Sequence, residues 1–231
     1  MNFRILGSGW ATRSDIIDRM IEEAGKEQEE MAKQVRRDDI PPFDEEGLVT
    51  GVDVSYVDEK AIGAAVTIDL SKNKTIRKRT LVIPCEFPYV SGYFHLRESP
   101  VLISLLNELG ETGPILIDAN GILHQRCCGL ASYVGIKSNR QTIGVAKSLL
   151  LGDIGPRRGD IALITDAEET VGATLWLGKE NPLYVSIGHR ITLETAIEIV
   201  NRVAKSGRPE PIVKADHESR RVAEGVKETI I

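Results

Sequence analysis

The chain has few cysteines, few aromatic side chains and no long hydrophobic run. Its three cysteines, Cys85, Cys127 and Cys128, are odd in number and two of them are adjacent, so they make a poor disulfide framework. We therefore expect a reducing, cytoplasmic location. No apolar stretch approaches the ~20 residues needed to span a bilayer, and the N-terminal sequence shows no secretory signal. These absences predict a protein without a membrane partner.

The chain also lacks an excess of positive charge, since 29 Lys+Arg stand against 34 Asp+Glu and the net charge is −5. Residues 1–47 hold 7 basic and 12 acidic side chains, which leaves 22 of each in residues 48–231. Residues 119–152 contain no acid, and their cations are Arg126, Lys137, Arg140 and Lys147. This local positive stretch suits contacts with phosphates, although four cations over that length are also ordinary for a solvated surface.

The first part of the chain predicts a helix and a linker. Residues 13–38 place Ile16, Ile17, Met20 and Ile21 at helical spacing, and the other faces are acidic. The sequence "DIPPFDEEG" then breaks the pattern. We expect residues 1–47 to form an acidic helix and linker packed on a main domain of residues 48–231, and we expect a monomer.

The main domain begins with an antiparallel meander, because β-rich segments at 48–57, 61–70 and 75–87 are joined by short links. Residues 88–98 are expected to form a loop. Ser99 and Pro100 are typical of a helix start, and Gly110 is typical of a helix end.

The second half predicts short strands at 114–118, 141–146 and 160–165, a hairpin at 174–189, and helices at 191–208 and 214–226. The expected fold class is α/β. An antiparallel meander and parallel strands would share one mixed sheet with helices on both faces. This order matches the ribonuclease H-like architecture.

Several acidic residues are candidates for a shared metal site. Asp53 lies in the otherwise apolar "LVTGVDVSYV", where a buried carboxylate is costly unless it is paired or bound to a metal. Asp118 ends the strand that follows the meander. Glu98 and Asp216 are further candidates, and such oxygen ligands suit Mg²⁺ or Mn²⁺, which lower the pKa of bound water. The ordinary alternative is a set of separate structural acids.

Other side chains near Asp118 suggest catalysis but have ordinary explanations as well. His124 is a candidate for orienting a nucleophilic water or for general acid chemistry, and the alternative is a turn histidine bonded to the backbone. Lys147 follows an apolar strand and suits a scissile phosphate, but a solvated surface lysine has the same pattern. Cys127 or Cys128 with His124 would resemble a Cys–His pair, but nothing places an oxyanion hole. A zinc site is excluded, because "HQRCC" lacks the usual spacing.

Five stretches together are similar to the endonuclease V family of deoxyinosine-directed repair nucleases. They occur in the family's order and spacing, and with "GRPEP" and "AD" they cover residues 45–220. The stretches are "GVDVSY" (51–56), "PYVSGYFHLRESPVL" (88–102), "LIDANGILHQRCCGLASYVGI" (116–136), "TIGVAKSLL" (142–150) and "YVSIGHRITLETAI" (184–197).

The resemblance implies a ribonuclease H-like nuclease domain that nicks the second phosphodiester bond 3′ to deoxyinosine, leaving 3′-hydroxyl and 5′-phosphate ends. It implies a need for Mg²⁺, for which Mn²⁺ substitutes. The family's metal ligands match Asp53, Glu98, Asp118 and Asp216, with His217 beside the last. Its catalytic histidine and lysine match His124 and Lys147.

The resemblance also implies a site for the lesion. Tyr89 would be the wedge that fills the gap left by an extruded base, since stacking on an aromatic ring is worth ~1–3 kcal/mol per base. Gly92, Gly121 and Gly144 permit close backbone approach to that base, and Arg126 is a candidate phosphate ligand. The chain departs from the family pattern at Ser91, Ala119 and Gln125.

Two alternatives to the deoxyinosine nuclease remain at this stage. One is an inosine-specific ribonuclease of the same fold, because the residues do not show which sugar is read. The other is a non-catalytic binder of inosine-containing nucleic acid, which the loss of any carboxylate would have favoured.

Overall fold

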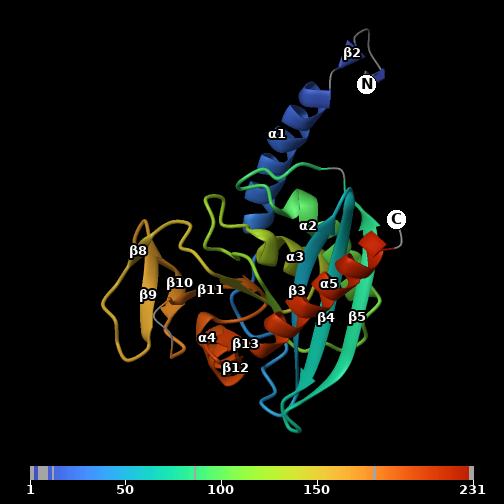
Figure 1. The fold of residues 1–231 in the computed structure, drawn as a ribbon. Helices are drawn as coiled ribbons and strands as arrows, with labels where there is room; N and C mark the ends of the chain where they lie inside the picture. Colours follow the sequence, from blue (N-terminus) through green and yellow to red (C-terminus); the bar gives the residue numbers. More distant parts are fainter. Residues whose placement is uncertain (1–2, 5–9, 12, 86, 179–180, 229–231) are drawn as a thin grey trace.

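The computed structural model describes residues 3–4, 10–11, 13–85, 87–178 and 181–228. Within these ranges a sheet of nine strands has the order β5-β4-β3-β6-β7-β11-β10-β9-β8 (Figure 1). Its strands are β3 (Leu48–Val57), β4 (Lys60–Asp69), β5 (Lys74–Pro84), β6 (Ile115–Ile117), β7 (Thr142–Ala146), β8 (Asp153–Ile154), β9 (Ile161–Asp166), β10 (Glu169–Leu175) and β11 (Leu183–His189).

The sheet is mixed, as the sequence predicts. Strands β3, β4 and β5 form the antiparallel meander, while β6 runs parallel to β3 on one side and to β7 on the other. The antiparallel strands β11, β10, β9 and β8 extend the far edge. The expected α/β fold class, a mixed sheet flanked by helices, is therefore confirmed.

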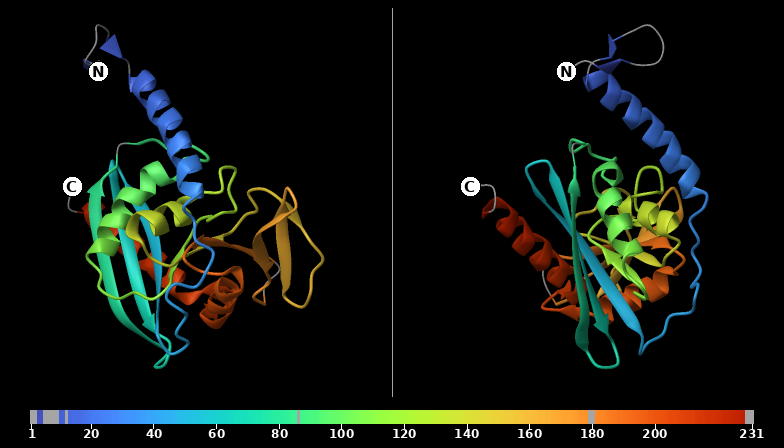
Figure 2. Two further views of the ribbon diagram at one scale, coloured as in Figure 1. Left: turned by 180° about the vertical axis from the view of Figure 1, so that it is seen from behind. Right: turned by 90° about the vertical axis from the view of Figure 1, so that its right-hand side faces the viewer.

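Helices cover both faces of the sheet (Figure 2). They are α1 (Arg13–Ala32), α2 (His95–Asn107), α3 (Leu130–Ser138), α4 (Leu193–Arg202) and α5 (Glu210–Glu228). Strand β6 shows why both faces need cover, because its side chains alternate between two cores. Ile115 and Ile117 pack with residues of α2 and α3, whereas Leu116 packs with residues of α4 and α5.

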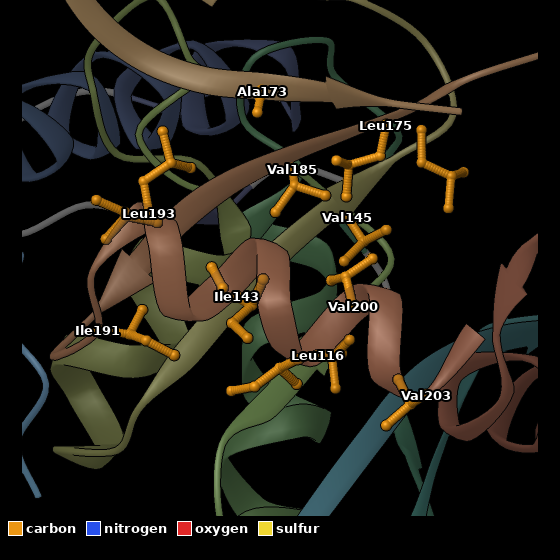
Figure 3. Close-up of a cluster of buried hydrophobic side chains, with 14 of the residues drawn as sticks. Leu116, Ile143, Val145, Ala173, Leu175, Val185, Ile191, Leu193, Val200 and Val203 are labelled. Carbon is orange, nitrogen blue, oxygen red and sulfur yellow. The ribbon is translucent and has the colours of Figure 1, made fainter. Parts of the chain in front are cut away.

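The larger core lies between α4 and the central strands (Figure 3). Val145 and Val185 project from β7 and β11 toward Leu193 and Val200 of the amphipathic helix α4. This packing fixes the centre of the sheet, whose strand ends carry the polar residues described below.

Helix α1 contacts the body only through its later turns, and its first turns extend beyond it (Figure 2). The buried side chain of Met31 packs with Cys128 and Tyr133. The division of the chain at residue 47 stays a prediction. No helix in the described ranges combines the length and apolar character of a membrane span.

Several predicted boundaries were wrong. Helix α2 begins at His95, so Pro100 lies inside it and Ser99 is not its cap. The predicted loop 88–98 therefore contains the first turn of α2, and Glu98 belongs to the helix. The predicted helices at 13–38 and 191–208 end early, at Ala32 and Arg202, because a turn and a short hairpin follow them. The last helix begins at Glu210, ahead of residue 214.

Short elements were missed. They are β8 and two hairpins, β1 (Phe3–Arg4) with β2 (Trp10–Ala11), and β12 (Ala204–Lys205) with β13 (Arg208–Pro209). Pairs of two-residue strands carry no measurable alternation of apolar and polar residues, so the sequence gives no signal for them.

Candidate active site

Asp53 and Asp118 lie next to each other on adjacent parallel strands. In the β3–β6 register, Val52 is opposite Ile117, so the following residues are Asp53 in mid-strand and Asp118 at the end of β6. The register places the positions of Asp53 and Asp118 beside each other, directly after the last paired residues of the two strands.

Burial and nearby acids both act on Asp53. Burial, together with the carboxylates of Asp118 and Asp216, raises the pKa of Asp53 to about 6, although a hydrogen bond from Ser219 acts in the opposite direction. The Ser219 hydroxyl lies 3.0 Å from Asp53 Oδ2 and 2.9 Å from the carbonyl oxygen of Asp216. The hydrogen bond and the nearby cation thus do not offset the cost of burying the ionised Asp53 carboxylate beside other acids.

Glu98 approaches the same acids from the first turn of α2. Burial, together with the charges of Asp53 and Asp118, raises its pKa to about 8. The hydroxyl of Tyr56 donates to Glu98 Oε1 at 3.0 Å, and the Arg97 guanidinium lies 4.1 Å from the centre of the Tyr56 ring. Tyr56, on the same strand as Asp53, therefore fixes Glu98 above the sheet.

Helix α5 brings Asp216 toward the site. Its carboxylate is paired with Arg220 at 2.8 Å and acts electrostatically on Asp53. The adjacent His217 is exposed. Of these two candidate ligands, the structure therefore associates Asp216 with the carboxylate group.

Two cations face Asp118. Lys147 follows β7, the neighbour of β6, and its ammonium group donates to Asp118 Oδ2. Arg208, in β13, has its guanidinium 4.0 Å from the same oxygen. Lys147 therefore lies beside the proposed ligands rather than apart from them.

A divalent cation fits these residues by donor chemistry. Four carboxylates supply the hard oxygen ligands that Mg²⁺ prefers. Two of them, Asp53 and Glu98, have pKa values raised by burial and by neighbouring carboxylates, an effect that a bound cation would reverse. However, within the described ranges no three His, Cys, Asp or Glu side chains already lie close enough to hold a metal. The carboxylates are instead engaged by Lys147, Ser219, Tyr56 and Arg220.

His124 is buried and neutral. Burial lowers its pKa to about 4, and the nearby charge of Arg126 adds to this effect. The backbone N–H of Arg126 lies 3.3 Å from His124 Nδ1, which accepts the bond, so the ring proton resides on Nε2. The ring can therefore donate a hydrogen bond but is a weak source of protons at neutral pH.

A pocket of about 270 Å³ opens beside Asp118, His124 and Lys147. Its walls come from α1, the loop before α2, the turn after β6 and the segment after β7. The residues that line it include Gln28, Tyr89, Ser91, Gly92, Phe94, His95, Asn120, Leu130 and Leu150. Tyr89 is 67% exposed and its ring meets Phe94 edge-on at 5.7 Å, so it stands at the rim.

The three candidate glycines have different surroundings. Gly92 lines the pocket and has φ +78°, a conformation that suits glycine. Gly121 and Gly144 face backbone, because a Cβ on Gly144 would lie 2.4 Å from the nitrogen of Gly121, and one on Gly121 would lie 1.9 Å from Ile187 O. Their role in the structure is close packing of the turn on the sheet. Ala119, one of the departures from the family pattern, has no positive φ.

The cations of the acid-free stretch are engaged within the protein. Arg126 donates to Gln28 Oε1 and to the carbonyl of Gly92, each at 2.8 Å. Lys137 pairs with Glu27 at 2.7 Å. Arg140 donates to carbonyl oxygens at the end of α2, including Leu106 and Leu109. In the structure, Arg126, Lys137 and Arg140 of this predicted phosphate-binding stretch are therefore engaged in hydrogen bonds or an ion pair with other parts of the protein.

Some residues of the site were not found by sequence reasoning. Gln28, Tyr56, His95 and Ser219 all contact the site or line the pocket. Only Gln28 gave a signal, since it continues the helical spacing of the apolar face of α1. The two cysteines beside His124 are not activated, because burial raises the pKa of Cys127 and raises that of Cys128 to about 12.

Known proteins are similar to this chain in sequence and in fold. The family model described as Endonuclease V matches residues 29–217. Endonuclease V of Ignicoccus hospitalis is 34% identical over 206 residues, which cover 88% of this chain and 96% of that protein. The crystal structure of endonuclease V from Streptomyces avermitilis is similar with a TM-score of 0.82 and 33% identity, covering 89% of this chain and 94% of that one.

A second solved structure has a ligand. Endonuclease V of Ciona intestinalis, in complex with a 24mer DNA that contains an inosine followed by a ribo-adenosine, has a TM-score of 0.81 and 31% identity. The match covers 90% of this chain and 99% of that one.

Proposed function

Because the chain belongs to the endonuclease V family of nucleases, we propose that it is a metal-dependent repair endonuclease for DNA containing deoxyinosine. It would nick the second phosphodiester bond 3′ to the lesion and leave 3′-hydroxyl and 5′-phosphate ends. The observation that carries this proposal is the group of carboxylates around Asp53 and Asp118, which are half-buried and lie beside Lys147 and an open pocket. The inosine-containing DNA bound to the Ciona intestinalis protein supports the choice of substrate.

The proposed cofactor is Mg²⁺, with Mn²⁺ as a substitute. Asp53, Glu98, Asp118 and Asp216 would hold it. When bound, such an ion lowers the pKa of water and stabilises negative charge at a phosphoryl centre.

The remaining residues have roles that follow from their surroundings. Neutral His124 would orient the attacking water through Nε2–H, since its lowered pKa makes it a poor proton donor. Lys147 would move from Asp118 to the scissile phosphate. Tyr89 would occupy the gap in the duplex while the lesion base enters the pocket, which repays part of the few kcal/mol that base extrusion costs.

An inosine-specific ribonuclease is the second candidate. It is favoured by the ribo-adenosine that follows the inosine in the Ciona intestinalis complex, because a ribose at that place is compatible with the site of that relative. A non-catalytic binder is disfavoured, since all four carboxylates are present.

The test is a cleavage assay with labelled duplexes that differ only by one deoxyinosine, together with an inosine-containing RNA. Each is incubated with Mg²⁺ or with EDTA. We expect one Mg²⁺-dependent nick in the inosine duplex and none in the undamaged duplex. Asp53→Asn should abolish the nick, while the matched variant Asp58→Asn, in the exposed turn after β3, should not. Binding without cleavage of either nucleic acid would refute the nuclease.

A further inference from the structure

The side chain of Gln28 is the most completely buried polar group on α1. It is 1% exposed although much of the helix around it is acidic and solvated. Its amide is used at both ends, because Nε2 donates to the carbonyl of Cys128 at 2.7 Å and Oε1 accepts from Arg126 Nε at 2.8 Å. Gln28 therefore connects α1 to the segment that follows His124.

The guanidinium of Arg126 is held on three sides. Besides Gln28, it donates to the carbonyl oxygen of Gly92 at 2.8 Å, and it lies 4.3 Å from the centre of the Tyr93 ring. A guanidinium is a rigid planar fork, so fixing one nitrogen also fixes the direction of the others. The bond from Gln28 thus sets where Arg126 meets Gly92.

Gly92 lies in the Tyr89 loop, which we define as residues 87–94. It has φ +78°, and a Cβ at this position would lie 3.1 Å from Gln125 and 3.3 Å from Arg126. The loop therefore rests directly on these two side chains. Tyr89 is three residues earlier in the loop and is largely exposed. The contacts at Gly92 are therefore one of the points at which this loop is attached to the rest of the fold.

We propose that Gln28 is a positioning residue for the Tyr89 loop. Through Arg126 and the carbonyl of Gly92, it holds Tyr89 at the rim of the pocket, ready to enter a duplex. The inference rests on the proposed function, because it assigns Gln28 and Arg126 to the step in which a base leaves the stack. It makes α1 part of substrate recognition and gives Arg126 a role other than binding phosphate.

The chemistry of the chain of contacts explains why glutamine suits this position. The group must accept a hydrogen bond from a cation at one end and donate to a carbonyl at the other, and a side-chain amide does both in a fixed planar geometry. Methionine has a similar length and fills the same space but makes neither bond. The substitution Gln28→Met therefore removes the contacts with little change in packing.

The two possible roles of Gln28 predict different kinetics. A residue that only stabilises the fold would affect all substrates equally. A residue that positions a duplex wedge should matter when strands must be opened, and should matter little for a single strand, whose bases are already accessible. The ratio of cleavage rates for the two substrates separates the roles.

The experiment measures single-turnover cleavage of one deoxyinosine oligonucleotide, as a duplex and as a single strand, by the full chain in Mg²⁺. For Gln28→Met we expect about a tenfold lower rate on the duplex, the order expected for loss of a hydrogen bond to a charged group, and less than about a twofold change on the single strand. The control is Gln34→Met, because Gln34 is exposed and its side-chain amide makes a long hydrogen bond of 3.5 Å to the Glu30 carbonyl of the same segment. Equal slowing on both substrates would overturn the proposal.

A double-mutant cycle tests whether Gln28 acts through Tyr89. Tyr89→Ala should itself lower the ratio of duplex to single-strand rates. If Gln28 acts through the loop, adding Gln28→Met should change that ratio no further, whereas independent effects would add. Full additivity would contradict the proposal.

Arg126→Lys provides a second variant in case Gln28→Met folds poorly. Lysine keeps the charge but cannot hold Gln28 and Gly92 together as a fork does, so the duplex rate should again fall selectively. A wild-type ratio of duplex to single-strand cleavage rates in Arg126→Lys would contradict the proposal that Gln28 acts through Arg126 on the loop. If the wild type cuts neither substrate, the proposed function itself has failed, which is distinct from an unchanged ratio in a working enzyme.

Discussion

Lys147 and Asp118 follow neighbouring parallel strands, and the Lys147 ammonium group is hydrogen-bonded to the Asp118 carboxylate. This contact gives the carboxylate a positive partner that belongs to the protein. A divalent ion bound by Asp118 would have to share that oxygen with the ammonium group or displace it. On the proposed function, Lys147 would therefore compete with the ion for Asp118 and, once released, would be free to contact a phosphate.

This competition predicts that Lys147→Met slows the reaction and at the same time strengthens the apparent binding of Mg²⁺. The cleavage rate at saturating Mg²⁺ should fall by roughly 10²-fold, the order found when a charge-stabilising group is removed from an active site. The Mg²⁺ concentration for half-maximal rate should also fall, because the competing cation is gone. A titration of single-turnover rates against Mg²⁺ measures both effects. Lys137→Met, which removes the pairing with Glu27, is the control, and a rise in the Mg²⁺ requirement would contradict the competition.

Glu98 predicts how stability without metal depends on pH. Its pKa is about 8 in the folded chain against an ordinary value of 4.5. The contribution of the Glu98 carboxyl group to the free energy of unfolding is therefore fully present below about pH 4.5 and is lost as the pH rises through about 8. Glu98→Gln removes this loss and can still accept the Tyr56 bond. In EDTA at about pH 8, we expect the variant to gain about 1–3 kcal/mol in free energy of unfolding.

Urea unfolding in EDTA at several pH values would measure the Glu98 effect. The control is Glu108→Gln, because Glu108 is exposed at the end of the same helix. Excess Mg²⁺ should stabilise the wild type more than Glu98→Gln, which would narrow the difference. If Glu98→Gln has a lower free energy of unfolding than the wild type in EDTA at about pH 8, then ionised Glu98 does not destabilise the fold.

The sequence was sufficient to predict the positions of those site residues that lie in strands or directly after them. Asp53 and Asp118 are polar residues in or after short apolar runs, and neighbouring strands in a mixed sheet bring such positions together. Lys147 follows the same rule on β7. The meander and the strand β6 could be predicted for the same reason, since the apolar residues in these segments are local.

Residues whose role depends on distant contacts could not be predicted in this way. Gln28 bonds to a residue 100 positions away, and no local pattern records that. Ser219 reaches Asp53 only because α5 lies across β3. The sequence also does not distinguish Gly144, which packs against backbone, from Gly92, which lines the pocket. Pro100 misled because proline is common at the first helical position, whereas here α2 begins at His95, without a side-chain cap at Phe94, and Pro100 lies inside it.

His95 predicts a loss of stability in acid. It is buried against Tyr133, neither ring nitrogen has a hydrogen-bond partner within the described structure, and burial lowers its pKa to about 4 from 6.5. The unfolded chain takes up a proton as the pH falls below about 6.5, while the folded chain resists until about 4. Stability is therefore lost as the pH falls between these values.

His95→Phe should remove that loss, because phenylalanine keeps a flat ring on Tyr133 and has no polar atom. Relative to the wild type, we expect a gain of about 1–2 kcal/mol at about pH 5 that shrinks near neutral pH. Thermal or urea unfolding at both pH values measures it. His217→Phe is the matched control, since His217 is exposed on α5, and an equal gain from both variants would reject the explanation.

Gly144 predicts how tightly the turn after β6 is packed on the sheet. A Cβ there would lie 2.4 Å from Gly121 N and 2.7 Å from Ala119 O, and both are backbone atoms of the turn that carries Asp118 and leads to His124. Neither the central strand β7 nor this turn can move without disturbing the other. Gly144→Ala should therefore cost about 2–4 kcal/mol in free energy of unfolding, the range of severe packing changes. Gly110→Ala is the control, because a Cβ at Gly110 meets no atom within 4 Å. If Gly144→Ala is as stable as that control but cuts the inosine duplex more slowly, then Gly144 acts on the substrate and not on the packing of the turn.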